Sequence, residues 1–96
     1  MTYRLQILRQ AREDMQTSAD WYNGQQEGLG QRFITEVIKT LRLAEANPLH
    51  YEAKFSKQFR FAMLHDFPFV VVYKTKGDLV IINAVFHTSR NPKKFI

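Results

Sequence analysis

The chain has 96 residues, 45% of them hydrophobic and 14% aromatic, which supports a single folded domain with one modest core over residues 1–96 and excludes a disordered chain. It contains no cysteine, so neither a disulfide framework nor a thiolate metal site can form. The formal net charge is +5, and residues 54–96 hold 8 basic against 2 acidic groups. This excess favours a polyanion or an acidic protein as partner, although such a charge is equally common among small proteins with no nucleic-acid role.

A short strand and two helices are predicted in the first half of the chain. Tyr3, Leu5 and Ile7 alternate with polar residues, as in a half-buried strand. From Gln10 to about Gln26 apolar residues recur at helical steps, and Glu13 and Asp14 are expected near the positive N-terminus of that helix. Glycines interrupt the pattern, and a second helical set then runs from Phe33 to Ala44 and ends before Pro48.

The second half of the chain has the patterns of three strands after a loop over roughly 48–57. Phe59, Phe61 and Met63 alternate with Arg60 and Ala62, and Phe69–Tyr73 and Leu79–Phe86 are largely apolar runs joined by a turn at Thr75–Asp78. The element order β-α-α-β-β-β predicts an α+β fold, in which a helical hairpin covers one face of a mainly antiparallel four-stranded sheet. We assign four side chains to the interior of that hairpin, namely Trp21, Tyr22, Phe33 and Val37.

The end of the last predicted strand is the first candidate site. His87 follows the apolar run and is itself followed by Thr88, Ser89 and Arg90. A histidine exchanges protons near neutral pH, and an arginine holds a phosphate or carboxylate, so the pair suits phosphodiester chemistry. In the structural alternative, His87 bonds the backbone and Arg90 anchors the tail that follows it.

Other candidates are weaker. Arg60 should point away from the face that carries Phe59 and Phe61, beside Arg90 and Lys57 or simply toward solvent. Tyr73 has a phenol that can exchange a proton or stack on a base, although an aromatic residue at this position more often belongs to the core. His50 and His65 lie on predicted loops without carboxylates at ligand spacing, so we expect no metal and no cofactor.

Element order and local strings together resemble the RelE/ParE toxin superfamily of type II toxin-antitoxin and plasmid stabilisation systems over essentially the whole chain. The most specific part is the C-terminal pattern: Phe67 to Tyr73, then Ile81 to Phe86, then His87-Thr88-Ser89-Arg90-Asn91-Pro92. Weaker matches lie earlier, at Ala11 to Met15, Gly30 through Leu41, Asn47-Pro48 and Phe59-Arg60-Phe61.

The resemblance implies a toxin that arrests growth when its labile antitoxin is lost. ParE-type members poison DNA gyrase, whereas RelE-type members cut mRNA on the ribosome. A hetero-oligomer with the antitoxin is therefore expected. No apolar run approaches the length of a membrane span, and the N-terminus lacks a signal-peptide core. We accordingly expect a cytoplasmic protein without membrane contact.

One departure separates the two branches. RNA-cleaving members usually carry an arginine three residues before the tyrosine of this strand, and here that position is Val70. No carboxylate is expected beside His87 as a general base, although Lys54 and Lys57 offer amines whose pKa would have to be depressed. Ribosome-dependent mRNA cleavage remains the alternative, since Arg60 or Arg90 can offset Val70. A degenerate toxin that retains only antitoxin binding is a further alternative.

The sequence therefore predicts a ParE-like, non-enzymatic gyrase inhibitor. Its target-binding surface is expected to contain Arg60, His87, Arg90, Lys93 and Lys94. If the chain is instead a nuclease, the catalytic candidates are His87, Arg90, Arg60, Tyr73 and Lys57. Arg32 and Lys39 on the second helix are further basic residues that a target could contact.

Overall fold

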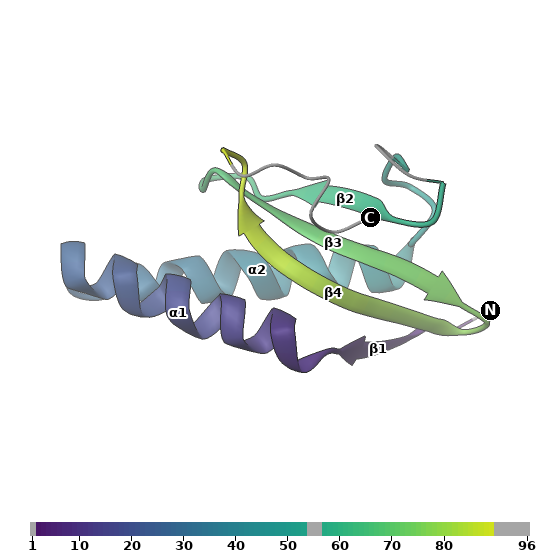
Figure 1. Cartoon of the computed structure of the whole chain (residues 1–96), viewed down its shortest axis with the longest axis horizontal. Coiled ribbons are helices and arrows are strands. Elements are labelled where there is room, and N and C mark those ends of the chain that lie inside the picture. The colour runs from purple at the N-terminus through teal and green to yellow at the C-terminus, as the bar shows by residue number, and fades with distance from the viewer. Residues whose placement is uncertain (1, 54–56, 90–96) are drawn as a thin grey trace.

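The computed structural model describes residues 2–53 and 57–89. Its element order is the predicted one, in which two helices follow a first strand and precede three more. The elements are β1 (Arg4–Ile7), α1 (Arg9–Gln25), α2 (Leu29–Ala46), β2 (Arg60–Met63), β3 (Phe69–Lys76) and β4 (Leu79–His87). The prediction of an α+β fold with a helical hairpin and four strands is confirmed, and Figure 1 shows both helices on one side of the sheet.

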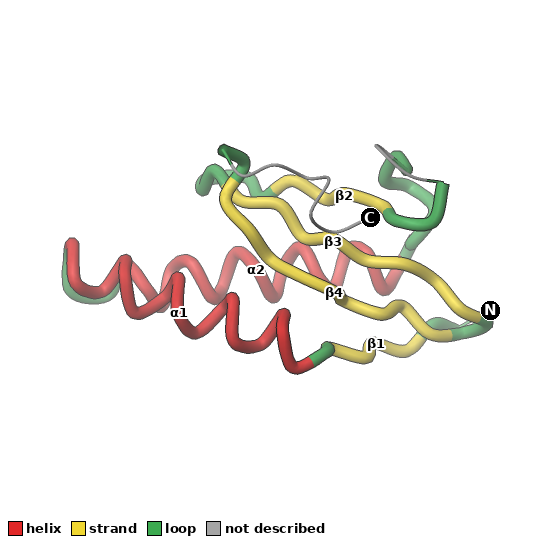
Figure 2. The backbone as a smooth tube through the Cα atoms, in the orientation of Figure 1, coloured by secondary structure: helices red, strands yellow, loops and turns green. Residues whose placement is uncertain are grey.

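The sheet is mixed, with strand order β1-β4-β3-β2. β3 is antiparallel to both β2 and β4, while β1 runs parallel to β4. The helical hairpin connects β1 to β2, which lie at opposite edges of the sheet. The chain leaves the edge beside β4, crosses one face of the sheet as two helices, and returns at the edge beside β3, and this long connection permits the parallel pairing of β1 with β4 (Figure 2). Mainly antiparallel pairing was predicted, and the parallel pair at one edge is the added detail.

Two helix boundaries differ from the predictions. α2 begins at Leu29, earlier than the expected Phe33, because Gly28 with φ 85° takes the left-handed turn between the helices. α1 begins at Arg9, so Glu13 and Asp14 lie in its second turn and no acidic residue lies in its first. Their predicted place at the helix N-terminus was therefore wrong, and both carboxylates are available for other contacts.

Apolar side chains are buried on both faces of β3 and β4. Val71, Tyr73 and Val85 belong to the cluster that packs against the helices, while Val70 and Phe86 belong to a second cluster on the other face. Because successive residues of a strand point to opposite faces, burial on both sides explains why these strands are apolar at almost every position.

The prediction for Trp21 was wrong. Tyr22 packs against Phe33 and Phe67, with ring centroids 5.3 and 5.0 Å away, and Val37 is fully buried. Trp21, however, is 60% exposed. The buried positions of α1 include Ala19, and two helical steps turn Trp21 by about 200° away from that direction. The tryptophan therefore contributes to the surface of the molecule.

A β-bulge interrupts the β3–β4 pairing. Tyr73 pairs with Ile82 and Val72 pairs with Ala84, so Asn83 is the additional residue in β4. Its Oδ1 is buried, and it has no hydrogen-bond partner among the residues that the structure describes. Beyond the bulge, Val85 and His87 face the helical side, and Phe86 faces the opposite side.

The two helices approach closely at Gly30. Its N–H donates to Asn23 Oδ1 at 2.8 Å, and an added Cβ would lie 2.3 Å from the Ala19 carbonyl oxygen. Glycine at this position therefore sets the separation of the helical hairpin. By contrast, an added Cβ at Gly24 of α1 would meet nothing within 4 Å.

We predict that Gly30→Ala lowers the free energy of unfolding by about 1–3 kcal/mol, because the backbone at Ala19 must move. Urea denaturation checks this value. Gly24→Ala is the matched control and should be neutral or stabilising by up to about 1 kcal/mol, since alanine favours helix and here meets no neighbour. Equal effects of the two substitutions would contradict the close approach at Gly30.

Candidate functional site

His87 ends β4 and is held by contacts on two sides. Its Nδ1 accepts the backbone N–H of Ser89 at 3.0 Å and lies 2.8 Å from Ser89 Oγ. The ring meets the edge of Phe69, with centroids 5.3 Å apart. Because Nδ1 accepts a hydrogen bond, the proton of the neutral ring is on Nε2. The predicted structural role of His87 at the strand end is therefore present, and Nε2 is left to interact with a ligand.

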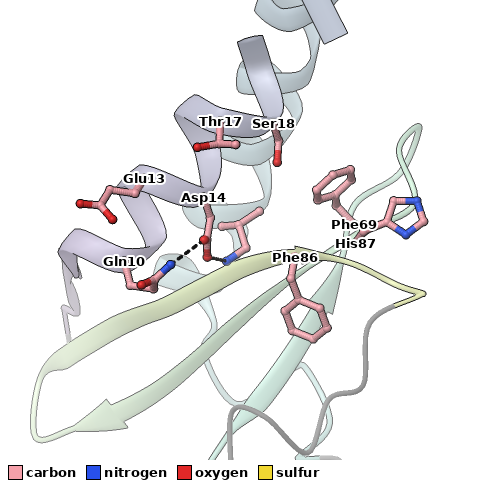
Figure 3. A pocket seen from close by; sticks show the side chains of 9 residues that line it. Gln10, Glu13, Asp14, Thr17, Ser18, Phe69, Phe86 and His87 are labelled. Carbon is pink, nitrogen blue, oxygen red and sulfur yellow. Dashed lines mark hydrogen bonds between the residues drawn. The ribbon is translucent and has the colours of Figure 1, made fainter. Parts of the chain in front are cut away.

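A groove lies between α1 and the end of β4, and we call it the α1–β4 groove. It consists of two adjoining cavities, of about 210 and 560 Å³, that share Thr17, Ser18, Phe69 and His87. The smaller one is polar and is completed by Gln10, Glu13, Asp14 and the end of β4 (Figure 3). The larger one is mainly apolar and is completed by Trp21, Tyr22, Pro68 and Ser89.

Asp14 connects α1 to the sheet in this groove. Its Oδ2 accepts the backbone N–H of Val85 at 3.0 Å, and its Oδ1 accepts from Gln10 Nε2 at 2.8 Å (Figure 3). Sequence reasoning expected no carboxylate beside His87, yet Glu13 and Asp14 line the same cavity as this histidine. No local pattern indicates this contact, since Asp14 and Val85 are 71 positions apart.

Arg60 and Tyr73 form a separate group. Arg60 Nη1 donates to the Tyr51 carbonyl oxygen at 2.6 Å, and it lies on the helical side of the sheet, away from Phe61, as predicted. Tyr73 is fully buried, and its O–H donates to the Pro48 carbonyl oxygen. Burial raises the pKa of Tyr73 to about 12, although the charge of Arg60 opposes the rise. Tyr73 is thus a core residue that cannot stack on a base.

The described candidates do not converge on one site. Arg60 pairs with Tyr73, whereas His87 pairs with Phe69, and four residues of strand separate these positions by about 13 Å. Lys57 is exposed ahead of β2. The remaining candidates, Lys54, Arg90, Lys93 and Lys94, lie outside the described residues.

The histidines on the loops do not assemble a metal site within the described part of the chain. His65 Nδ1 lies 2.9 Å from Asp66 Oδ1 on the surface, and the His50 ring packs against Tyr51. No group of three or more residues of the types that ligate metals occurs among residues 2–53 and 57–89. In the same ranges no helix is long and apolar enough to cross a membrane.

Comparison with known proteins gives one family and one fold. Residues 5–92 match the family described as ParE toxin of type II toxin-antitoxin system, parDE. The solved structure described as the chromosomal ParDE TA system from P. aeruginosa is similar to this chain, with a TM-score of 0.81 and 17% identity. The alignment covers 90% of this chain and 96% of that one. A comparison with curated proteins finds no match.

We predict that the Tyr73 phenol ionises well above the ordinary pKa of a tyrosine. Burial raises the pKa of Tyr73 from 10.0 in the unfolded chain to about 12 in the folded chain, so the neutral phenol stabilises the fold. This stabilisation is complete at pH values below 10.0, and it is lost as the pH rises through about 12. Ultraviolet titration of tyrosinate should show one late step, and Tyr73→Phe should remove it.

Tyr3→Phe is the control for this titration, and it should retain the late step. Tyr73→Phe also leaves the Pro48 carbonyl without its donor, so we expect a loss of about 1–3 kcal/mol in unfolding free energy. A late step that persists in Tyr73→Phe would contradict the assignment.

Proposed function

We propose that this chain, which belongs to the ParE toxin family of type II toxin-antitoxin systems, arrests bacterial growth by inhibiting DNA gyrase. In this proposal the toxin acts in the cytoplasm, and a cognate antitoxin binds and neutralises it. The family match covers residues 5–92, which includes all of the fold's elements except the first residue of β1. The proposal therefore concerns the chain as a whole.

The observation that carries the choice of gyrase over mRNA is the dispersal of the groups a nuclease would need. Val70 occupies the position of the arginine of RNA-cleaving members, and it is buried in the second cluster. The Tyr73 phenol is buried and donates to Pro48, so it cannot transfer a proton to a substrate. Arg60 lies at the other end of β3 from the position that pairs with His87. General acid–base catalysis requires such groups within hydrogen-bond reach of one bond.

The charges of the groove support the same choice. Glu13 and Asp14 line the cavity beside His87, and their carboxylates repel a phosphate backbone. Among the described residues that line the two cavities of the α1–β4 groove, only His87 can become positively charged. Within the described part of this groove, an RNA strand positioned for cleavage at His87 would therefore meet mainly negative charge.

We further propose that the toxin contacts its target through the basic residues of the C-terminal half. This surface contains Arg60, His87, Arg90, Lys93 and Lys94. Residues 54–96 hold 8 basic and 2 acidic groups, and such an excess favours association with an acidic surface or with a DNA–protein complex. The contact is one of binding, and it needs no catalytic group.

We predict that induction of this chain alone in a bacterial host stops DNA synthesis before protein synthesis. Gyrase inhibition blocks replication, whereas mRNA cleavage blocks translation, so pulse labelling within minutes of induction separates the two. If protein synthesis fails first, mRNA cleavage replaces gyrase inhibition as the function. If neither fails, the toxin is inactive, as a degenerate toxin would be, or its target lies elsewhere.

Arg90→Ala should weaken toxicity, measured as the inducer concentration that halves the growth rate at equal protein level. Loss of one charged contact is expected to weaken target binding by about tenfold, equivalent to about 1.4 kcal/mol. Arg42→Ala is the control, because Arg42 is an exposed α2 residue paired with Glu45. Unchanged toxicity of Arg90→Ala would exclude Arg90 from the target-binding surface.

A further inference from the structure

The end of the β3–β4 hairpin and the start of β1 carry basic residues that lie close together. Lys74 and Lys76 belong to the last turns of β3 before the hairpin turn, and Arg4 begins β1 beside them. Figure 1 shows that this end of the sheet extends past both helices. We call Arg4, Lys74 and Lys76 the basic hairpin end.

All three side chains point to the face of the sheet opposite the helices. Tyr73 belongs to the cluster that packs against the helices, so Lys74 and Lys76 point the other way because side chains alternate along a strand. Leu5 packs against the same cluster, so Arg4 also points away from the helices. The basic hairpin end is therefore one surface rather than three separate positions.

The strand register sets the spacing of these cations. Arg4 and Lys76 both pair with Leu79, from the two sides of β4. Two strand spacings separate them by about 10 Å, and Lys74 lies about 7 Å from Lys76 along β3. A single stretch of a polyanion can therefore contact all three side chains.

One carboxylate lies beside this surface, at the hairpin turn. Asp78 Oδ2 accepts from Arg4 Nε at 3.1 Å, Oδ1 accepts from Nη2 at 3.3 Å, and the Asp78 carbonyl oxygen accepts the Arg4 N–H at 2.8 Å. These bonds attach the start of β1 to the turn. Within residues 2–53 and 57–89, neither Lys74 nor Lys76 has a carboxylate at ion-pair distance. The surface therefore keeps a positive charge that the fold does not neutralise.

The aromatic ring next to this surface is already in use. Lys74 Nζ lies 5.7 Å from the centroid of the Phe59 ring, and Phe59 packs against the second cluster. Binding of single-stranded nucleic acids depends on rings that are free to stack on bases. A duplex keeps its bases stacked inside and presents its phosphates to a basic surface. The position of Phe59 therefore favours a duplex over a single strand.

A protein partner is a poorer match for the same surface. Protein interfaces combine an apolar centre with a polar rim. In the described part of the chain, the large apolar side chains that are exposed lie on α1, α2, the loop after α2 and the end of β2. The basic hairpin end thus offers charge without an apolar centre, which is what a phosphate backbone requires.

We propose that the basic hairpin end binds the phosphate backbone of duplex DNA without reading its sequence. The two lysines each contact a phosphate, and Arg4 contacts another with the N–H donors that do not bond Asp78. This inference goes beyond the proposed function and does not depend on it, because DNA itself is the ligand. In a complex with a DNA-bound target, the contact would add to the binding of the toxin to the enzyme–DNA assembly.

The salt dependence of DNA binding tests the proposal. Purified toxin is added to a short fluorescent duplex, and polarisation gives the affinity from about 50 to 200 mM salt. The logarithm of the affinity should fall linearly with the logarithm of the salt concentration, because bound cations release counterions from the DNA. The double variant Lys74→Gln/Lys76→Gln should reduce this slope by about two and weaken binding about tenfold or more at the lowest salt.

Matched variants separate a local contact from net charge. Arg9→Gln/Arg42→Gln removes the same charge from exposed helical positions that are paired with carboxylates, and it should leave the slope unchanged. Asp78→Asn removes the carboxylate beside the surface and should strengthen DNA binding by about twofold to fivefold. All substituted side chains are at least partly exposed, so each variant is expected to fold, and thermal melting checks this.

Several results would overturn the proposal. Equal losses in the two double variants would reduce the effect to net charge. Tighter binding of a single strand than of the duplex would show that bases are contacted. Polyglutamate that binds while duplex DNA does not would assign the surface to an acidic protein. The assay contains no gyrase, so its result is independent of the experiment that tests growth arrest.

Discussion

The pairing of β3 with β4 is the interaction on which the rest of the structure depends. Eight residue pairs join the two strands, from Phe69↔His87 to Lys76↔Leu79, and both strands are buried on both faces. The helices pack on one face of this pair, and β1 and β2 extend it at its two edges. Burial of an apolar strand pair on both faces supplies much of the apolar area that a chain of this length can remove from water.

The bulge at Asn83 determines which side chains of β4 reach the groove. If the register of the pairs next to the turn continued without a bulge, Phe69 would pair with Phe86. Phe86 would then lie on the helical side of the sheet. The additional residue shifts the pairing so that Phe69 faces His87 instead. Because side chains alternate along a strand, a shift of one residue exchanges the two faces. His87 and the Val85 N–H reach α1 for this reason.

Periodicity predicted the strands, the helices and their order, because burial on one or two faces leaves a direct trace in the spacing of apolar residues. Trp21 shows the limit of that reasoning: it was assigned to the core together with Tyr22, which packs against the core cluster, although the helical step turns Trp21 to the surface. The contact between Asp14 and Val85 depends on where α1 crosses the sheet. The separation of Arg60 from His87 depends on strand register. Neither property is encoded in local spacing.

Opposite charges divide the surface of a chain whose net charge is +5. Basic residues are concentrated in its second half, yet the α1–β4 groove carries the carboxylates of Glu13 and Asp14. His87 belongs to both regions, since it lines the groove and is also part of the proposed target-binding surface. A partner bound in this groove would cover His87 and thereby block part of the proposed target-binding surface.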